Sequence, residues 1–563
     1  MDKTLALKNK NLLRNLYNNH LDLGDLYFKT HRPNNAIYHY HCALLINKNS
    51  NKLFLRVFNL FCLLKIKNQK VQFLKNICLF YLRQNSVYHN LMFYNAFQFT
   101  KFFEFKKEKK KLKISNQFIS ENLLSVCNDE ILQLILKKCL VRNIELEFFL
   151  KKIRASLLEI YFAEKKKIYK IYSFLISLAE QCFFNEYVYE TSTRENFLIK
   201  KLKNKISNDS KFCELSFLIL TLYQEPMKSK KLSKKMKNYK SNSPEFNQLL
   251  VFTYKNQIIE NEIKREFSKK KIKDKCSKLV RSQYEENPYP RWRYTSFPMD
   301  ESFQSFIKSK HLLNDNFPKK NNYEILIAGC GTGHQVVQYS GIRNSKICAI
   351  DLSASSLSFA KRTAYELEIK NVNFFNMDLL DINVLNKKFD FIICSGCLHH
   401  MQKPEEGLRS LLNVLNDDGL LNIGLYSKIA RNEIHWVRQY IKKHLIEVSE
   451  VNMIKLRKKI LKSSNTKFKE ITRSIDFFSF SRFRDLVFNF QEHNFNIFQL
   501  KNIFEKYNLI FLGFDRVSSL VMQRFKKRFP YDNSEYDLNY WNAFEKDNPK
   551  TFASMYNIWL KNN

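Results

Sequence analysis

Glycine and proline are scarce in this chain, with 10 of each among 563 residues. From Asn34 to Glu225 the sequence contains neither of them. Because tight turns between strands rely on these two residues, their absence excludes a turn-rich β structure over this range. Leu, Ile, Phe and Lys recur there at helical spacing instead. We therefore expect residues 1 to about 275 to form an all-helical domain.

Long hydrophobic runs are also missing. None approaches the ~18 residues that a bilayer-crossing helix needs, so we expect no membrane insertion. The opening residues, MDKTLALKNKNLLRN, hold no uninterrupted apolar segment, which argues against a secretory signal. The 12 cysteines are scattered between residues 42 and 397 without the spacing of a disulfide framework. These features together predict a cytoplasmic protein with free thiols.

Acidic residues are few beside basic ones, at 54 against 94, which gives a net charge of +40. A chain this basic could bind nucleic acid or an anionic surface. The lysines, however, are spread along the chain rather than gathered in one patch. Lys, Asn, Ile and Phe are abundant together, as an A/T-rich coding sequence would give. We interpret the charge as mainly compositional, with RNA kept as an alternative partner.

One helical repeat is visible in the N-terminal part. The segment LGDLYFKTHRPNNAIYHYHCALLINKN has the offsets of a tetratricopeptide repeat at Leu23, Gly24, Tyr27, Ala36, Tyr40 and Ala43. No clean second copy follows at the same period. Such a helical array either recruits a protein or peptide partner or only scaffolds the neighbouring domain, and both readings stay open.

Three of the few glycines fall within five residues, at Gly329, Gly331 and Gly333 in the sequence GCGTG. The apolar run ILIA precedes them, and a plausible helix, HQVVQYS, follows. Glycine is favoured where the backbone takes φ > 0 or where a ligand approaches it closely. A strand, a glycine turn and a helix N-terminus together predict a binding site for part of a nucleotide-like ligand.

Further strand ends follow in order. The strand in SKICAIDLS ends in Asp351, 22 residues after Gly329, where an acidic residue can bind both ribose hydroxyls of a nucleotide. The segment VNFFNMDLLD places Asp378 where it can accept a hydrogen bond from an adenine amino group. A fourth strand, FDFIICS, opens at Cys394 and Ser395 into a loop, and a fifth lies in LLNIGLYS. This alternation predicts a doubly wound α/β sheet with its ligand at the carboxyl ends of the strands.

This ordered set resembles the class I S-adenosylmethionine-dependent methyltransferases, whose first motif is matched by GCGTG. The chain departs from the family at Ile327, where Asp or Glu is common. The resemblance implies an α/β Rossmann-like class I methyltransferase domain behind the all-α helical-repeat domain, with S-adenosyl-L-methionine as the cofactor. The cofactor-binding residues that it implies are Gly329, Cys330, Gly331, Gly333, Asp351, Leu352, Asp378, Leu379, Cys394 and Ser395.

The segments SQYEENPYPRW and FRDLVFNFQEHNF are similar to bacterial proteins that join a tetratricopeptide-like domain to a methyltransferase. We expect a helical domain over 1–275, a linker or lid over 276–320, and a methyltransferase domain over 321–563 with a helical insertion at about 430–500. Within the linker, Tyr284, Tyr289, Arg291 and Trp292 either close over the cofactor or pack a proline-rich connection.

The loop after the fourth strand reads CSGCLHHM. Two cysteines and two histidines resemble half of a zinc site, but Cys397 is the last cysteine, so we predict no metal. In the family this loop passes the methionine end of the cofactor. We predict His400 as a general base and expect His399, Tyr426 and His493 to contact the acceptor; a histidine that merely packs the loop is the alternative.

The polar run Gln491–His493 stands among aromatic residues, which is typical of a buried hydrogen-bonded network or of an acceptor pocket. The predicted function is S-adenosylmethionine-dependent methylation of an unknown acceptor, most plausibly a protein or peptide recruited by the helical domain. RNA methylation is an alternative, although CSGC stands where amino-directed base methylation has an Asn-Pro-Pro-Tyr-type motif. A non-catalytic S-adenosylmethionine-binding or tetratricopeptide interaction protein is the other alternative.

Overall fold

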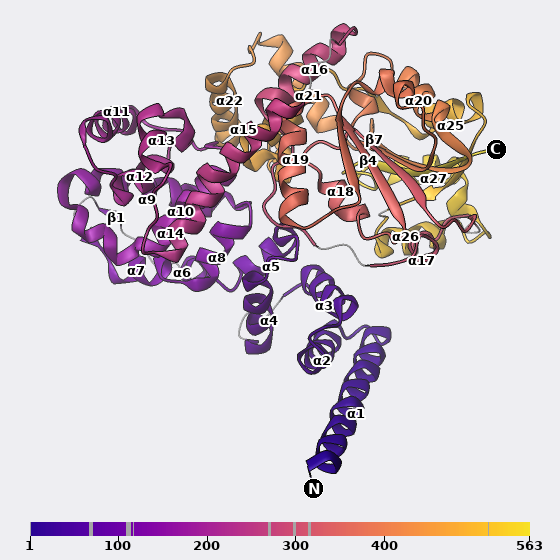
Figure 1. Cartoon of the computed structure of the whole chain (residues 1–563), viewed down its shortest axis with the longest axis horizontal. Helices are drawn as coiled ribbons and strands as arrows, with labels where there is room; N and C mark the ends of the chain where they lie inside the picture. Colours follow the sequence, from indigo (N-terminus) through magenta and orange to yellow (C-terminus); the bar gives the residue numbers. More distant parts are fainter. Residues whose placement is uncertain are drawn as a thin grey trace. The chain divides into compact units, whose positions relative to one another are not determined.

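The computed structural model describes residues 2–66, 71–108, 114–115, 118–267, 272–296, 300–313, 317–515 and 517–563. It divides into two compact units (Figure 1). Unit 1 comprises Met1–Tyr254 and Trp292–Met299, and unit 2 comprises Lys255–Arg291 and Asp300–Asn563. The domain limits expected at residues 275 and 320 stay predictions, and the expected linker includes residues 297–299 and 314–316, which lie outside the described residues.

Unit 1 is helical, as the lack of glycine and proline predicts. Its α-helices are α1 (Asp2–Lys29), α2 (Pro33–Ile46), α3 (Asn51–Leu63), α4 (Gln72–Arg83), α5 (Phe93–Phe97), α6 (Lys101–Lys107), α7 (Glu121–Cys127), α8 (Glu130–Lys138), α9 (Ile144–Glu164), α10 (Tyr172–Phe184), α11 (Thr193–Asn208), α12 (Glu214–Thr221), α13 (Lys230–Met236) and α14 (Pro244–Leu250). Short helical turns are η1 (His89–Met92), η2 (Lys165–Ile171), η3 (Pro226–Lys228) and η4 (Val251–Lys255). One antiparallel pair of two-residue strands, β1 (Ile114–Ser115) and β2 (Phe118–Ile119), departs from the all-helical expectation.

Small residues bring α1 and α2 together, as the repeat pattern predicts. A Cβ added to Gly24 would lie 2.5 Å from the ring of Tyr40, and Ala36 and Ala43 are fully buried. The Tyr40 hydroxyl donates to Asp25 at 2.6 Å across the same hairpin. This close helix pair is therefore present, whereas its continuation as a repeat array stays a prediction.

A short piece of the expected linker is held inside unit 1 by Arg293. Its guanidinium pairs with Glu180 at 2.5 Å, donates to the Lys137 carbonyl at 2.9 Å and lies 4.0 Å from the Phe252 ring centre. Trp292, which the sequence grouped with Tyr289, thus belongs to unit 1.

Unit 2 contains a mixed sheet of eight strands. They are β3 (Tyr323–Ala328), β4 (Ser345–Asp351), β5 (Val372–Asn376), β6 (Phe389–Ser395), β7 (Leu415–Ser427), β8 (Asn494–Phe495), β9 (Leu509–Phe514) and β10 (Tyr556–Asn562). The order is β5-β4-β3-β6-β7-β10-β9, with β8 paired to β7. The strands from β5 to β7 are parallel, and β10 is antiparallel to both of its neighbours. The strand order reverses beside β3, the place where open α/β sheets bind ligands.

Helices cover both faces of this sheet. The helical elements of unit 2 are α15 (Asn256–Glu266), α16 (Lys275–Glu286), α17 (Phe303–Lys308), α18 (His334–Tyr339), α19 (Ala354–Glu366), η5 (Leu379–Leu385), η6 (Leu398–His400), α20 (Pro404–Asn413), α21 (Asn432–Lys443), α22 (Glu450–Lys462), α23 (Thr466–Ile471), η7 (Ile475–Phe478), α24 (Phe480–Phe488), α25 (Ile497–Lys506), α26 (Ser519–Arg528), η8 (Ser534–Tyr536) and α27 (Leu538–Asp547). One apolar core joins the sheet to α20, α25, α26 and α27, and another joins it to α17, α18 and α19. The predicted α/β Rossmann-like fold is confirmed. Across the described part of both units, no helix is long and apolar enough to cross a membrane.

Candidate functional site

The glycine turn follows β3 and leads into α18. Gly329, Gly331 and Gly333 have φ of +69°, +52° and +82°, values that glycine adopts without strain. The main-chain N–H groups of Gly329 and Cys330 donate to the Ile350 carbonyl at 2.9 and 3.0 Å. The turn is therefore held against the end of β4.

Gly333→Ala should destabilise unit 2 more than Gly396→Ala, although the two positions have nearly equal φ of +82° and +83°. A Cβ at Gly333 would lie 2.7 Å from the Cβ of Ala360, whereas one at Gly396 has no atom within 4 Å. We expect a loss of about 1–2 kcal/mol from the left-handed backbone at either site and about 1–3 kcal/mol more at Gly333 from the clash. Denaturant unfolding followed by tryptophan fluorescence measures both. Equal losses would mean that Ala360 moves aside.

Asp351 ends β4 and faces the glycine turn. Its carboxylate accepts hydrogen bonds from the main-chain N–H groups of Gly331 and Ser353, both at 2.8 Å. Burial raises the pKa of Asp351 to about 6 although these two bonds lower it, and the charge of Glu285 raises it further. A partly exposed carboxylate beside a glycine turn can accept two hydroxyl donors, as the ribose assignment requires.

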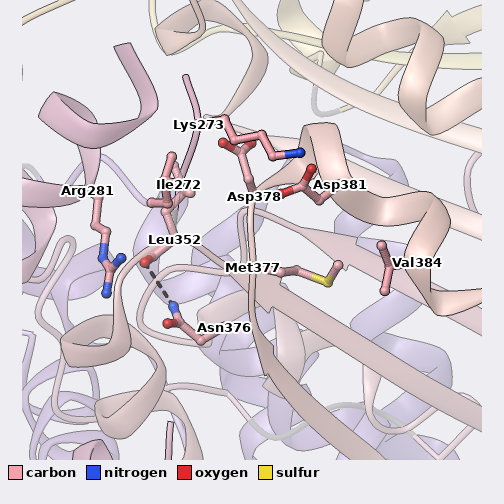
Figure 2. Close-up of a pocket in the computed structure, with 9 residues that line it drawn as sticks. All are labelled: Ile272, Lys273, Arg281, Leu352, Asn376, Met377, Asp378, Asp381 and Val384. Atoms are coloured by element: carbon pink, nitrogen blue, oxygen red, sulfur yellow. Dashed lines mark hydrogen bonds between the residues drawn. The ribbon is translucent and has the colours of Figure 1, made fainter. Parts of the chain in front are cut away.

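A cavity of about 230 Å³ lies next to Asp351, at the carboxyl ends of β4 and β5 (Figure 2). Its wall comprises Leu352, Asn376, Met377 and Asp378 from the strand ends, Asp381 and Val384 from η5, and Ile272, Lys273 and Arg281 from the α16 region. The Asn376 amide donates to the Leu352 carbonyl at 2.8 Å and fixes that strand end. The cavity has the mixed apolar and polar wall that an adenosine group needs.

Asp378 caps η5 by accepting from the Leu380 N–H at 3.1 Å, and Ser277 of α16 also hydrogen bonds to it. Burial raises the pKa of this carboxyl. The side chains of three other predicted cofactor residues, Cys330, Leu379 and Cys394, lie in the apolar cores. Only the main chain of those three can face a ligand.

The end of α16 is fastened to the start of α19. The Glu285 carboxylate accepts from the Ala354 N–H at 2.6 Å and from the Ser355 hydroxyl at 2.7 Å. The Ser353 hydroxyl donates to the Tyr284 carbonyl at 3.0 Å. The α16 segment thus forms one wall of the cavity, which is the candidate cofactor site.

Tyr289 and Pro290, which follow α16 in the chain, contact the glycine turn itself. The Thr332 hydroxyl donates to the Pro290 carbonyl at 2.5 Å, and a Cβ at Gly331 would lie 3.1 Å from the Tyr289 carbonyl oxygen. The Tyr289–Pro290 segment therefore lies against the turn, while the reading of Tyr284 and Tyr289 as a lid stays a prediction. Substituting Gly331 would push against the covering segment.

The loop after β6 brings the predicted acceptor residues together. The rings of His399 and Tyr426 lie 4.2 Å apart, the rings of His399 and His400 lie 4.3 Å apart, and the His493 N–H donates to the His399 carbonyl at 2.8 Å. Burial lowers the pKa of His399 well below its usual value, so its ring is neutral. Within the described residues, neither of its ring nitrogens makes a well-directed hydrogen bond.

His400 is placed differently. Its Nδ1 lies 2.7 Å from the Gln491 carbonyl. Because a carbonyl only accepts, Nδ1 carries a proton, and the neutral ring keeps Nε2 as an acceptor. This is the tautomer that a general base acting through Nε2 requires.

The run Gln491–His493 belongs to a buried network. Glu492, with a side chain only 1% exposed, accepts two hydrogen bonds from Arg431 at 3.0 and 2.9 Å and one from Arg438 at 2.8 Å. The Arg431 guanidinium lies 3.6 Å from the Tyr426 ring centre. This network holds one side of the acceptor region in place.

A second part of the network holds the side chains of Tyr284 and Tyr289. The Tyr284 hydroxyl donates to Asp485 at 2.7 Å, and the Tyr289 hydroxyl lies 3.4 Å from Asp476. Burial raises the pKa of both phenols well above the usual value, so both hydroxyls stay protonated as donors. In the described ranges, no cluster of three or more His, Cys, Asp or Glu side chains could hold a metal ion.

Residues 319–475 match the family model described as Methyltransferase domain. An uncharacterized protein of Synechococcus sp. is 35% identical over 126 residues, which make up 22% of this chain and 30% of that protein. The malonyl-[acyl-carrier protein] O-methyltransferase of Bacillus cereus is 27% identical over 148 residues, or 26% of this chain and 51% of that enzyme. The solved structure of PKMT2 from Rickettsia typhi in complex with AdoHcy aligns at 16% identity and a TM-score of 0.37, covering 48% of this chain and 55% of that chain.

The family match confirms the methyltransferase class that the sequence predicted for the C-terminal domain, with S-adenosylmethionine as the cofactor of that class. The chain covers less than two thirds of the length of each of these relatives. The site residues named from the sequence stay predictions, now with defined positions around one sheet edge.

Sequence reasoning missed one wall of the cofactor site. Ile272, Lys273 and Arg281 precede the first strand of the large sheet and lie in no motif. Glu285 lies in the SQYEENPYPRW segment, but no role was predicted for it. Asn376 is the last residue of β5, two positions before Asp378. Its place at a strand end could have predicted that it lines the cavity.

Proposed function

We propose that this chain is an S-adenosylmethionine-dependent methyltransferase of the cytoplasm that methylates a protein or peptide recruited by its helical unit. The observation that carries the proposal is the arrangement at one sheet edge. The glycine turn, the Asp351 carboxylate and a cavity lined by Asp378 follow one another along the carboxyl ends of β3, β4 and β5. The free state of all 12 cysteines agrees with a reducing compartment.

The residues present fit this cofactor. Asp351 would accept both ribose hydroxyls, Asp378 would accept from the adenine amino group, and the main chain at Gly329–Gly333 would lie along the methionine part. When bound, the cofactor supplies an electrophilic methyl group on a sulfonium. The protein's own task is to hold the acceptor in line with that methyl group and to exclude water, which is mainly a matter of positioning.

His400 is proposed as the group that takes a proton from an oxygen acceptor or a protonated amine. Its Nδ1–H is held by the Gln491 carbonyl, so Nε2 is the basic atom. His399, Tyr426 and His493 would shape the acceptor side. An acceptor atom that is already deprotonated needs no general base.

Unit 1 is proposed as the recruiting part because its α1–α2 hairpin has the small-residue packing of a tetratricopeptide repeat. The net charge of +40 favours RNA as the second candidate acceptor. The two candidate acceptors, protein and RNA, can be distinguished by which of them receives the methyl group.

The test is transfer of a radioactive methyl group from S-adenosylmethionine in a cell extract supplied with the full chain. We expect label that protease removes and ribonuclease leaves. Label removed by ribonuclease would overturn the protein acceptor in favour of RNA. Cofactor binding with no transferred label in either fraction would indicate a non-catalytic binding protein.

With the acceptor in hand, His400→Ala should lower kcat by about 10²–10⁴-fold while cofactor affinity is kept. His399→Ala, its neighbour, should instead lower stability, because it empties a fully buried site. Full turnover of His400→Ala across pH would mean that no histidine base operates.

A further inference from the structure

We propose that α1 carries a helix-pairing seam through which two copies of this chain associate. Five leucines of α1 are exposed among its described side chains: Leu12 by 67%, Leu13 by 52%, Leu16 by 45%, Leu23 by 38% and Leu26 by 54%. All of them except Leu13 lie along one side of the helix. Asn19, also exposed, stands between them. Their spacings of four, three, four and three residues are those of the core positions of a coiled coil.

This seam is distinct from the face that α1 uses within its own chain. α2 contacts α1 at Gly24, at Tyr27, whose ring stacks on His39 at 5.4 Å, and at His20, which lies 3.0 Å from His39. At 100° per residue, the average direction of these three positions lies about a quarter turn from that of the leucines, with Tyr27 nearest to Leu16. Among the described residues, the seam has no partner within the single chain.

The N-terminal part of α1 extends beyond the helix that packs against it, α2. Every side chain from Lys10 to Leu16 is exposed, so this stretch has no packing partner in the described part of unit 1. Figure 1 shows α1 reaching past α2 toward the N-terminus. Helices depend on packing an apolar face for most of their stability. A second helix laid along the leucines would supply that packing.

The occupant that fits is a second α1. In a parallel pair, Asn19 meets Asn19 of the other copy, and a primary amide both donates and accepts, so it can pair with itself. A single Asn at a core position is a known device for setting the register of such pairs. The charged side chains of Lys10–Lys29 number three basic and two acidic, so this helix escapes the strong repulsion that the net +40 of the chain imposes elsewhere.

Sedimentation velocity of the full chain over a range of about 1–100 μM tests this directly. We expect a concentration-dependent monomer–dimer equilibrium. Leu16→Lys and Leu23→Lys should each raise the dissociation constant at least about tenfold, because each places a charge in the seam of both copies. Asn19→Leu should lower it by removing the buried polar pair.

Leu63→Lys in α3 is the matched control, since Leu63 is 80% exposed and outside the seam; it should leave the dimer unchanged. A chain that stays monomeric throughout, or a dimer indifferent to both lysine variants, would overturn the proposal. A further measurement is binding of the chain to vesicles of anionic phospholipid. A monomer that binds these vesicles, and that loses this binding in Leu16→Lys, would contradict the dimer and assign the seam to a membrane surface.

Discussion

Glu492→Ala should lower the free energy of unfolding of unit 2 by about 3–5 kcal/mol, the cost of breaking a buried ion pair from one side. The Glu492 carboxylate accepts from Arg431 and Arg438, and its side chain is 1% exposed. Removing it leaves the Arg431 guanidinium, itself 7% exposed, without its counter-charge.

Tryptophan fluorescence suits the measurement, because three of the four tryptophans, Trp436, Trp541 and Trp559, lie in unit 2. Glu406→Ala is the matched control. Its pair with Lys403, at 2.8 Å, leaves the two side chains 47% and 68% exposed, so we expect a loss below about 1 kcal/mol. A Glu492→Ala loss as small as that of the control would mean that the arginines find other partners or water.

The network around Glu492 shows where sequence reasoning stops. Polar residues inside an aromatic segment indicated either a buried network or an acceptor pocket at Gln491–His493, and the structure shows a buried network at Glu492. The partners of Glu492 were not predictable, because Arg431 and Arg438 lie 61 and 54 residues earlier in the chain. Nothing in the local pattern of α21 distinguishes them from surface arginines.

The cofactor site divides in the same way. Gly329–Gly333 and Asp351 were predictable because a local motif requires glycine at left-handed positions and because the strand spacing places an acid at the next strand end. A lid over residues 276–320 was one reading of the sequence, but the contact that fixes α16 was not predictable. It depends on Glu285 meeting Ala354, a contact across 69 residues that only the folded chain creates.

The direction in which individual side chains point was also not predictable from the sequence. In β6, one residue of register decides whether a side chain faces the ligand or the core, and Cys394 faces the core. Cys330 lies in the glycine turn, where no strand periodicity indicates its direction, and its side chain also packs in a core. The exposure of the α1 leucines was also not predictable, because helical spacing does not tell which apolar side chains the chain covers, and the structure shows these exposed.

Asp351→Ala should weaken S-adenosylmethionine binding by about 2–4 kcal/mol, or roughly 30- to 1,000-fold, because two hydroxyl hydrogen bonds to a charged acceptor are lost. The same substitution removes the acceptor for the Gly331 and Ser353 N–H groups, so the unfolding free energy must be measured beside the affinity. Asp417→Ala, at an exposed position of β7, is the control and should change neither quantity. Calorimetry that finds wild-type affinity in a folded Asp351→Ala protein would remove the ribose assignment.

The pH dependence gives an independent check on the same carboxyl. Its pKa of about 6 lies above the ordinary 3.8, so folding favours the protonated form, and the stability that this group contributes is lost as pH rises from about 3.8 through 6. Ribose hydroxyls would donate to the ionised form and lower this pKa, so cofactor affinity should rise with pH over the same range. Between about pH 5 and pH 7 we expect a gain of up to about tenfold in the wild type. Asp351→Asn, which cannot ionise, should show a flat profile over this range, and a profile as steep as that of the wild type would assign the titration to another group.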